Sequence, residues 1–307
     1  SYPFIALYNA GAALFRAIGN SKISMINSAI MNVINIGLNA VFIFGFKWGV
    51  FGAVLATLIA RMVACTVILK TLSHKNNELY VDDYLHWHFD FTYIKKILTI
   101  GIPSGLENGM FQFGKILVQS LIASFGTYSI AANAVSNNLA QMQIIPGMAM
   151  SLAMVTVVGR CVGANDYKQA KYYIKKLMKI TYITMAVLIT VLLVFTPIIL
   201  KFYALSKETI DLAYQCIFIH TIFAATIWPL AFTFPNALRA SNDAKFTMIV
   251  SATSMWIFRF CFSYIIGRYM GYGLLGVWIA MFIDWIVRSI FFIWRYHSGK
   301  WMNKQLV

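Results

Sequence analysis

Residues 16–25 read RAIGNSKISM, and residues 239–248 read RASNDAKFTM. The two stretches share four of ten positions at a shift of 223. A second block repeats at a shift of 224, with Gly49, Gly52 and Ala56 corresponding to Gly273, Gly276 and Ala280. Chance similarity between two segments rich in Gly and Ala is the alternative, but two blocks at nearly the same shift favour duplication. The sequence therefore predicts a chain with two related halves.

The composition is that of a membrane protein. Hydrophobic residues make up 60% of the chain and charged residues 11%, and the mean hydropathy is +0.71. Soluble domains are about one quarter charged. The apolar segments are continuous, whereas the strands of an outer-membrane barrel alternate apolar and polar residues. Several segments reach the about 20 residues that a membrane-spanning helix needs. Repeated halves in such a protein are typical of a transporter built from two bundles around a central cleft.

Nine apolar segments are predicted to span the membrane. They cover about residues 2–18, 23–46, 50–72, 93–124, 128–160, 174–203, 208–238, 246–267 and 273–297. One alternate set of connections carries 17 Lys and Arg residues and the other set carries four. The basic set marks the cytoplasmic side, which puts the C-terminus inside the cell. Most of the net charge of +15 thus reflects topology, and nucleic acid is not expected as a partner.

The repeat predicts how the spans are grouped. Six spans lie between residues 93 and 297, so this region forms one complete lobe. Residues 1–75 then form the last three helices of the other lobe, 76–92 a cytoplasmic linker and 298–307 a cytoplasmic tail. Shifting the second copy back by 223 leaves the first copy short of about 130 residues, or three helices. The predicted fold is an all-α polytopic membrane protein with two parallel six-helix repeats, of whose twelve helices about nine are present.

Several short motifs occur in order along the whole chain. They are FRAIGN at 15–20, NVIN at 32–35, WGVFGA at 48–53, IGIPSGLE at 100–107, FPNALRA at 234–240 and GVWIA at 276–280. Together they resemble the MATE family, the multidrug and toxic compound extrusion transporters. The resemblance implies two six-helix lobes in the cell membrane and export of organic cations in exchange for H+ or Na+. We expect a monomer without a cofactor. The family's first helix often carries a coupling Asp, and no such helix is found here.

Glu107 is the main candidate for ion coupling. Lys96 is taken as the cytoplasmic end of its helix, so eleven residues at about 1.5 Å each place Glu107 about 17 Å deep, near the midplane. Desolvation there would favour the neutral acid, and a cationic drug would compete with the proton. One site could then support antiport. The alternative is a structural Glu hydrogen-bonded to broken backbone near Pro103 and Gly105.

Other ionisable side chains within the spans are functional candidates because they are costly in lipid. Lys115 lies eight residues beyond Glu107 and, with Gln112, continues a polar side. It could discharge an acidic partner, or it could be a snorkelling or structural lysine. Asp284 and Arg288 are four residues apart, a spacing that places both on one helix face. We expect them to form a structural ion pair.

A set of polar residues is predicted to line the cleft. Its remaining members are Asn32, Asn35, Asn39, Asn133, Asn137, Gln141 and Arg259. Asn32, Asn35 and Asn39 form one stripe along a helix. Arg259 corresponds to Asn35 at the shift of 224. Polar stripes in a span must face other helices or water. Hydrogen bonding between helices without ligand contact is the alternative.

Two other functions were compared with cation export. A flippase for lipid-linked oligosaccharides or peptidoglycan precursors would need cations for the pyrophosphate, and Lys115, Arg259 and Arg288 could supply them. An enzyme would need a nucleophile and base or a metal motif, and the chain has no HExxH, Walker loop or Ser-His-Asp arrangement. The four cysteines lack CxxC spacing, so no metal site is predicted.

Overall fold

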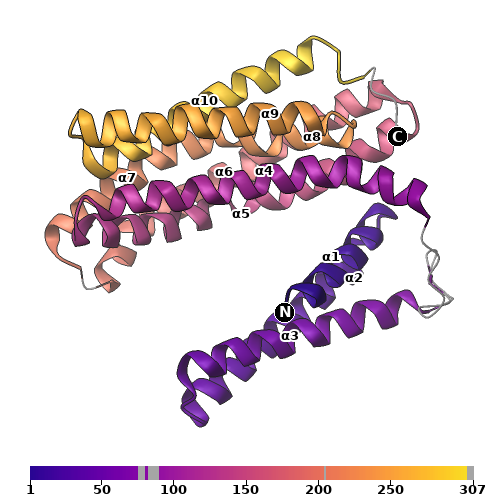
Figure 1. The fold of residues 1–307 in the computed structure, drawn as a ribbon, viewed down its shortest axis with the longest axis horizontal. Helices are drawn as coiled ribbons and strands as arrows, with labels where there is room; N and C mark the ends of the chain where they lie inside the picture. Colours follow the sequence, from indigo (N-terminus) through magenta and orange to yellow (C-terminus); the bar gives the residue numbers. More distant parts are fainter. Residues whose placement is uncertain (75–79, 82–89, 204, 303–307) are drawn as a thin grey trace. The chain divides into compact units, whose positions relative to one another are not determined.

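The computed structural model describes residues 1–74, 80–81, 90–203 and 205–302, except the side chain of Ile100. Across these residues the chain is helical and contains no strand (Figure 1). It divides into two compact units, Ser1–Phe89 and Asp90–Val307. Most of the linker predicted for 76–92, and half of the tail predicted for 298–307, lie outside the described residues.

The first unit is a bundle of three long helices. These are α1 (Tyr2–Ala17), α2 (Ser21–Ala40), which continues as the π-helical turn η1 (Val41–Gly45), and α3 (Gly49–Leu72). Its core lies between α1 and α3, where Phe15 and Ile68 are fully buried. Gly11 allows this close approach, because a Cβ there would lie 2.8 Å from Ile68 Cγ1.

The second unit contains the remaining helices. They are α4 (Phe91–Ala123), α5 (Thr127–Gly163), α6 (Tyr167–Phe202), α7 (Lys207–Thr226), η2 (Pro229–Thr233), α8 (Pro235–Ala240), α9 (Ala244–Ser254), η3 (Met255–Cys261), η4 (Ser263–Tyr269) and α10 (Gly273–His297). The predicted span 208–238 is therefore interrupted next to Pro229 and Pro235, because proline removes a backbone hydrogen bond and bends a helix.

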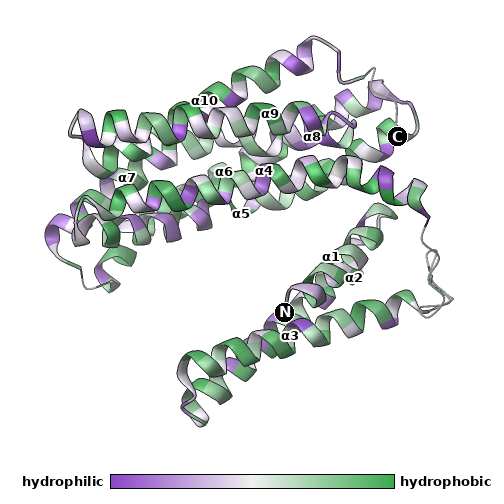
Figure 2. Cartoon of the chain, viewed as in Figure 1, coloured by the Kyte–Doolittle hydropathy of each residue, from purple (hydrophilic) through white to green (hydrophobic). Residues whose placement is uncertain are grey.

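Seven of the described helices are long and apolar enough to cross a membrane. Hydrophobic residues colour most of their length in both units (Figure 2). The seven correspond to predicted spans. The other two predicted spans are helices that differ from this pattern: α1 has 16 residues, and the apolar sequence of α4 is interrupted by Glu107, Gln112 and Lys115. The chain is a multi-pass helical membrane protein.

The repeated blocks have the same local structure in both units. At the shift of 223, Arg16 Nη1 donates to Ser24 Oγ at 3.0 Å and Arg239 Nε donates to Thr247 Oγ1 at 3.3 Å. Between these partners the chain turns through a residue of positive φ in each copy, +87° at Gly19 and +63° at Asn242. The equivalent residues therefore stabilise the same turn between two helices.

The second block also has matching backbone geometry. Gly49 and Gly273 begin α3 and α10 with φ values of +52° and +55°. Three residues later, Gly52 and Gly276 allow close packing against the preceding helix. A Cβ on Gly52 would lie 2.8 Å from Phe42 Cβ, and one on Gly276 would lie 2.7 Å from the N atom of Gly267. In both copies that preceding helix contains a π-helical turn, η1 and η4.

Candidate functional site

Glu107 forms an ion pair that ties α4 to α8. Its Oε1 accepts a hydrogen bond from Arg239 Nη2 at 2.6 Å, with 13% of the Glu107 side chain and 28% of the Arg239 side chain exposed. The other guanidinium nitrogens contact Asn236 Oδ1 at 3.0 Å and Thr247 Oγ1 at 3.3 Å. Arg239 therefore holds the middle of α4 against the turn between α8 and α9.

The pair fixes the level of Glu107 relative to the neighbouring helix α9. Thr247 lies in the first turn of α9, and farther along α4 a Cβ on Gly114 would lie 2.5 Å from Met255 Cε. Glu107, in the middle of α4, is therefore level with the beginning of α9. Its depth in the membrane stays a prediction.

Three cations gather around one aromatic ring in the same unit. Lys115 Nζ, Arg259 Cζ and Arg288 Cζ lie 5.0, 5.5 and 5.4 Å from the ring centroid of Phe111. These residues come from α4, η3 and α10. We call Phe111, Lys115, Arg259, Arg288 and Asp284 the Phe111 cluster. Each cation is within the range of a cation–π contact.

Asp284 is the carboxylate of this cluster. Its Oδ1 accepts hydrogen bonds from Arg288 Nε at 2.8 Å and from Ser254 Oγ at 2.5 Å. Asp284 is fully buried and Arg288 is 2% exposed. The expected contact between these two side chains is thus present, and it also connects α10 to α9.

Lys115 and Arg259 form no salt bridge among the described residues, although the Asp284 carboxylate attracts the charge of Arg259. Neither side chain makes a hydrogen bond or salt bridge there, and both are partly exposed. Arg259 lies in the π-helical segment η3. A π-helical turn adds a residue to the turn, redirects the side chains, and frequently occurs at functional sites.

The predicted polar residues of α4 and α5 separate into buried and exposed groups. Asn133 is 4% exposed; its Nδ2 donates to Gln119 Oε1 at 3.0 Å, and its Oδ1 accepts from Trp278 Nε1 at 3.2 Å. Its amide thus connects α4, α5 and α10. Gln112, Asn137 and Gln141 are exposed on the unit, and Asn137 Nδ2 donates to the backbone O of Asn133 at 2.8 Å.

The amides of the first unit lie along α2. Asn35 Nδ2 donates to Thr57 Oγ1 of α3 at 3.3 Å, and Asn39 Nδ2 donates to Asn35 Oδ1 at 3.0 Å. Asn32 is exposed. The contact of Asn35 joins α2 to α3, as in the alternative to cleft lining, whereas the contact of Asn39 lies within α2. A role of these amides in ligand contact stays a prediction.

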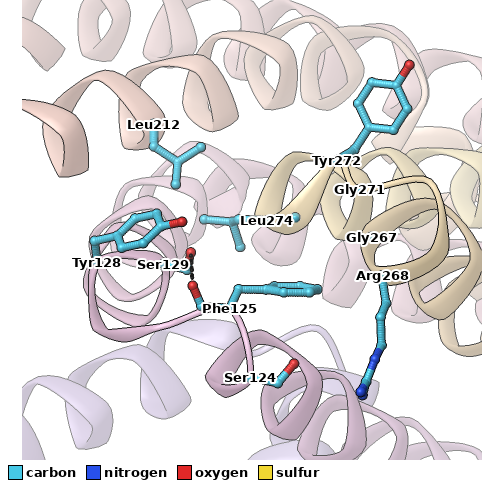
Figure 3. A pocket seen from close by; sticks show the side chains of 11 residues that line it. Ser124, Phe125, Tyr128, Ser129, Leu212, Gly267, Arg268, Gly271, Tyr272 and Leu274 are labelled. Atoms are coloured by element: carbon cyan, nitrogen blue, oxygen red, sulfur yellow. Dashed lines mark hydrogen bonds between the residues drawn. The ribbon is translucent and has the colours of Figure 1, made fainter.

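An open pocket of about 500 Å³ lies elsewhere in the second unit. Figure 3 shows Ser124, Phe125 and Tyr128, from the α4–α5 connection and the start of α5, opposite Arg268 and Tyr272, from the end of η4 and the η4–α10 connection. These connections belong to the set that carries few basic residues. The pocket therefore lies at the end of the unit predicted to face outward, away from the Glu107–Arg239 pair.

Arg239 and Phe111 were missed as site residues in the sequence. Arg239 was assigned to a cytoplasmic loop because it follows an apolar run. Its position at the head of the repeated block was a usable signal, since Arg16 occupies the same place in the first copy. For Phe111 there was no signal, because one Phe among 24 in an apolar chain does not indicate which face it occupies.

Comparison with known proteins agrees with this architecture. The family model MatE matches residues 103–265. The chain is 26% identical over 310 residues to "Probable multidrug resistance protein YoeA" of Bacillus subtilis (strain 168), with 99% of this chain and 66% of that protein covered. It is 24% identical to "Probable multidrug resistance protein NorM" of Thermotoga maritima, with 96% and 64% covered. The chain thus spans about two thirds of the length of these relatives.

A solved structure has the same fold. It is described as "Outward-facing conformation of a multidrug resistance MATE family transporter of the MOP superfamily", and it aligns with a TM-score of 0.88 at 21% identity. The alignment covers 98% of this chain and 68% of that one. Because the family model matches more than half of the chain and the described residues form a helical structure with seven candidate membrane spans, this chain belongs to the MatE family.

Proposed function

We propose that the protein is a secondary active antiporter that exports drug-like compounds, organic cations among them, in exchange for H+ or Na+. The observation that carries this proposal is the Glu107–Arg239 pair at 2.6 Å. The Glu107 carboxylate is partly exposed, and its single ionic contact with Arg239 joins α4 to α8. Such a contact can be exchanged for a cation from solution.

The mechanism follows from competition at Glu107. A proton or Na+ that binds the carboxylate weakens its attraction for Arg239, and α4 is then released from the α8–α9 turn. When the ion leaves, the pair forms again. An organic cation that binds Glu107 would replace the coupling ion in the same way. The two ligands would therefore exclude each other at the same carboxylate, and this mutual exclusion allows one to be exchanged for the other.

The organisation of the complete transporter is part of this proposal. Residues 1–75 would belong to one lobe and 93–297 to the other, with 76–92 as linker and the tail at 298–307 in the cytoplasm. The repeated turns at Gly19 and Asn242 support two related copies in the chain. In this arrangement the Glu107–Arg239 pair lies at the cytoplasmic end of its lobe, where it meets ions and drugs from inside the cell.

The Glu107→Gln variant tests the proposal. The substituted amide keeps an oxygen that can accept from Arg239 but cannot bind a proton or Na+ as a carboxylate does. We expect efflux of a fluorescent cation from vesicles, driven by an imposed pH or Na+ gradient, to fall at least tenfold. The ion whose gradient no longer drives efflux in the variant is the coupling ion. The measurement uses the complete protein in proteoliposomes.

Glu208→Gln is the matched control. Glu208 is exposed in the first turn of α7, at the opposite end of the unit, so the same change of charge should leave efflux at the wild-type rate. Gradient-driven efflux that persists unchanged in Glu107→Gln would remove this carboxylate from the coupling step.

A further inference from the structure

The Phe111 cluster carries an excess of positive charge. Lys115, Arg259 and Arg288 provide three cations, and Asp284 provides one carboxylate, which already pairs with Arg288 at 2.8 Å. The ring of Phe111 attracts cations but has no net charge, so it cannot neutralise them. Uncompensated charges in a membrane protein are costly and are kept where they serve a substrate or ion. The three cations of the cluster therefore outnumber its one carboxylate.

The buried part of the cluster also has unfilled hydrogen-bonding groups. Only 3% of the Arg288 side chain is exposed, and its Nη2 is buried without a hydrogen-bond partner. The second oxygen of Asp284, Oδ2, is likewise buried without a partner. A guanidinium presents its donors in a planar fork that matches carboxylate and phosphate oxygens. The free acceptor on Asp284 suits a hydroxyl group or water next to such an anion.

We infer that the Phe111 cluster binds the anionic group of a substrate, with Lys115 and Arg259 as its main charged contacts. The partly exposed ring of Phe111 and its neighbour Phe232, whose centroid lies 5.6 Å from Arg288 Cζ, provide an apolar surface beside the anion site. The substrate class is an amphipathic organic anion or a zwitterion carrying a carboxylate, sulfonate or phosphate group. This inference rests on the proposed transport function and adds a charge preference to it.

The observed contacts favour an anion over a cation at this place. A cation would meet three like charges and no free carboxylate in the cluster, because Asp284 is paired with Arg288. Glu107, in the same helix as Phe111, is paired with Arg239. The same chemistry could be presented by a soluble organic anion or by the phosphate headgroup of a lipid. These two sources share the anion and differ in whether it is attached to a long hydrocarbon chain.

Binding of two dyes of opposite charge tests the inference. Fluorescein, an anion, and rhodamine 123, a cation, share the xanthene ring system, so a comparison of their dissociation constants isolates charge. The complete protein is purified in nanodiscs, and binding is followed by fluorescence polarisation without any ion gradient. We expect Lys115→Gln and Arg259→Gln each to weaken fluorescein binding at least tenfold and to leave rhodamine 123 binding unchanged or tighter.

Two further variants separate the charge effect from damage to the fold. Lys115→Arg keeps the positive charge and should bind fluorescein within about threefold of the wild type. Lys201→Gln removes an exposed lysine at the end of α6 and should have no effect. If fluorescein binding does not respond to Lys115 or Arg259, or if rhodamine 123 loses affinity equally, the cluster is not an anion site.

Competition identifies the source of the anion. Displacement of fluorescein by farnesyl diphosphate but not by inorganic diphosphate or benzenesulfonate would indicate a lipid headgroup. Displacement by benzenesulfonate would indicate a soluble organic anion. Because binding is measured without a gradient, a failure of this site leaves the efflux result for Glu107→Gln intact, and the reverse also holds.

Discussion

Asp284→Ala is expected to lower the free energy of unfolding by about 3–5 kcal/mol, the usual cost of removing one partner of a buried ion pair. The substitution removes the acceptor at 2.8 Å from Arg288 Nε and at 2.5 Å from Ser254 Oγ. Arg288, which is 2% exposed, would keep its charge with no partner. Since Arg259 and Lys115 surround the same ring, the loss of the carboxylate also increases repulsion between cations. Unfolding of the complete protein in mixed micelles measures the change.

The double variant Asp284→Ala/Arg288→Ala provides the internal test. If the cost arises from an unpaired arginine, the double variant should regain part of the stability lost by the single one, and the coupling between the two positions should exceed about 1 kcal/mol. Asp211→Ala is the matched control, because Asp211 is exposed on α7. A single Asp284 variant as stable as this control would show that the pair has no structural role.

Gly276→Ala is expected to destabilise the protein by about 3 kcal/mol, at the upper end of the usual cost of overpacking. The added Cβ would lie 2.7 Å from both N and Cα of Gly267 and 2.8 Å from the carbonyl carbon of Ile266. All three are backbone atoms, so no side chain can rotate to make room. Helix η4 would have to move away from α10, or the variant would not fold. Thermal unfolding, monitored by size-exclusion chromatography, checks this result.

Gly159→Ala is the control for this substitution. Gly159 lies within α5, and a Cβ there would meet no atom within 4 Å. Alanine is the better helix former by about 1 kcal/mol, so this variant should be as stable as the wild type or more stable. Equal behaviour of the Gly276 and Gly159 variants would mean that the close approach of α10 and η4 is not needed.

The repeated blocks were the most informative part of the sequence for the fold. Their residues form local structures within a few positions of one another, such as the Arg16–Ser24 and Arg239–Thr247 contacts. A local contact of this kind leaves a pattern in the sequence, because the same side chains are needed at the same spacing in both copies. The repeat therefore indicated the duplication, and the motifs around it indicated the family.

The depth and partner of Glu107 could not be read in the same way. Arg239 is 132 residues away in the chain, and its contact depends on how far α4 extends before the neighbouring helix begins. Hydropathy gives the approximate length of each span but not the offset between adjacent helices. The pairing of Glu107 with Arg239 could not be predicted for this reason.

By itself the sequence determined that the chain is helical, crosses the membrane several times and contains two related copies, because these properties depend on apolar length, charge placement and local turns. Only the tertiary structure decided that Glu107 pairs with Arg239 and that Lys115, Arg259 and Arg288 surround Phe111. Those contacts depend on the rotation and offset of packed helices, and the π-helical turns in η3 and η4 change the rotation by a residue. The face of such a helix on which a side chain lies is therefore set by packing and not by the spacing of residues in the sequence.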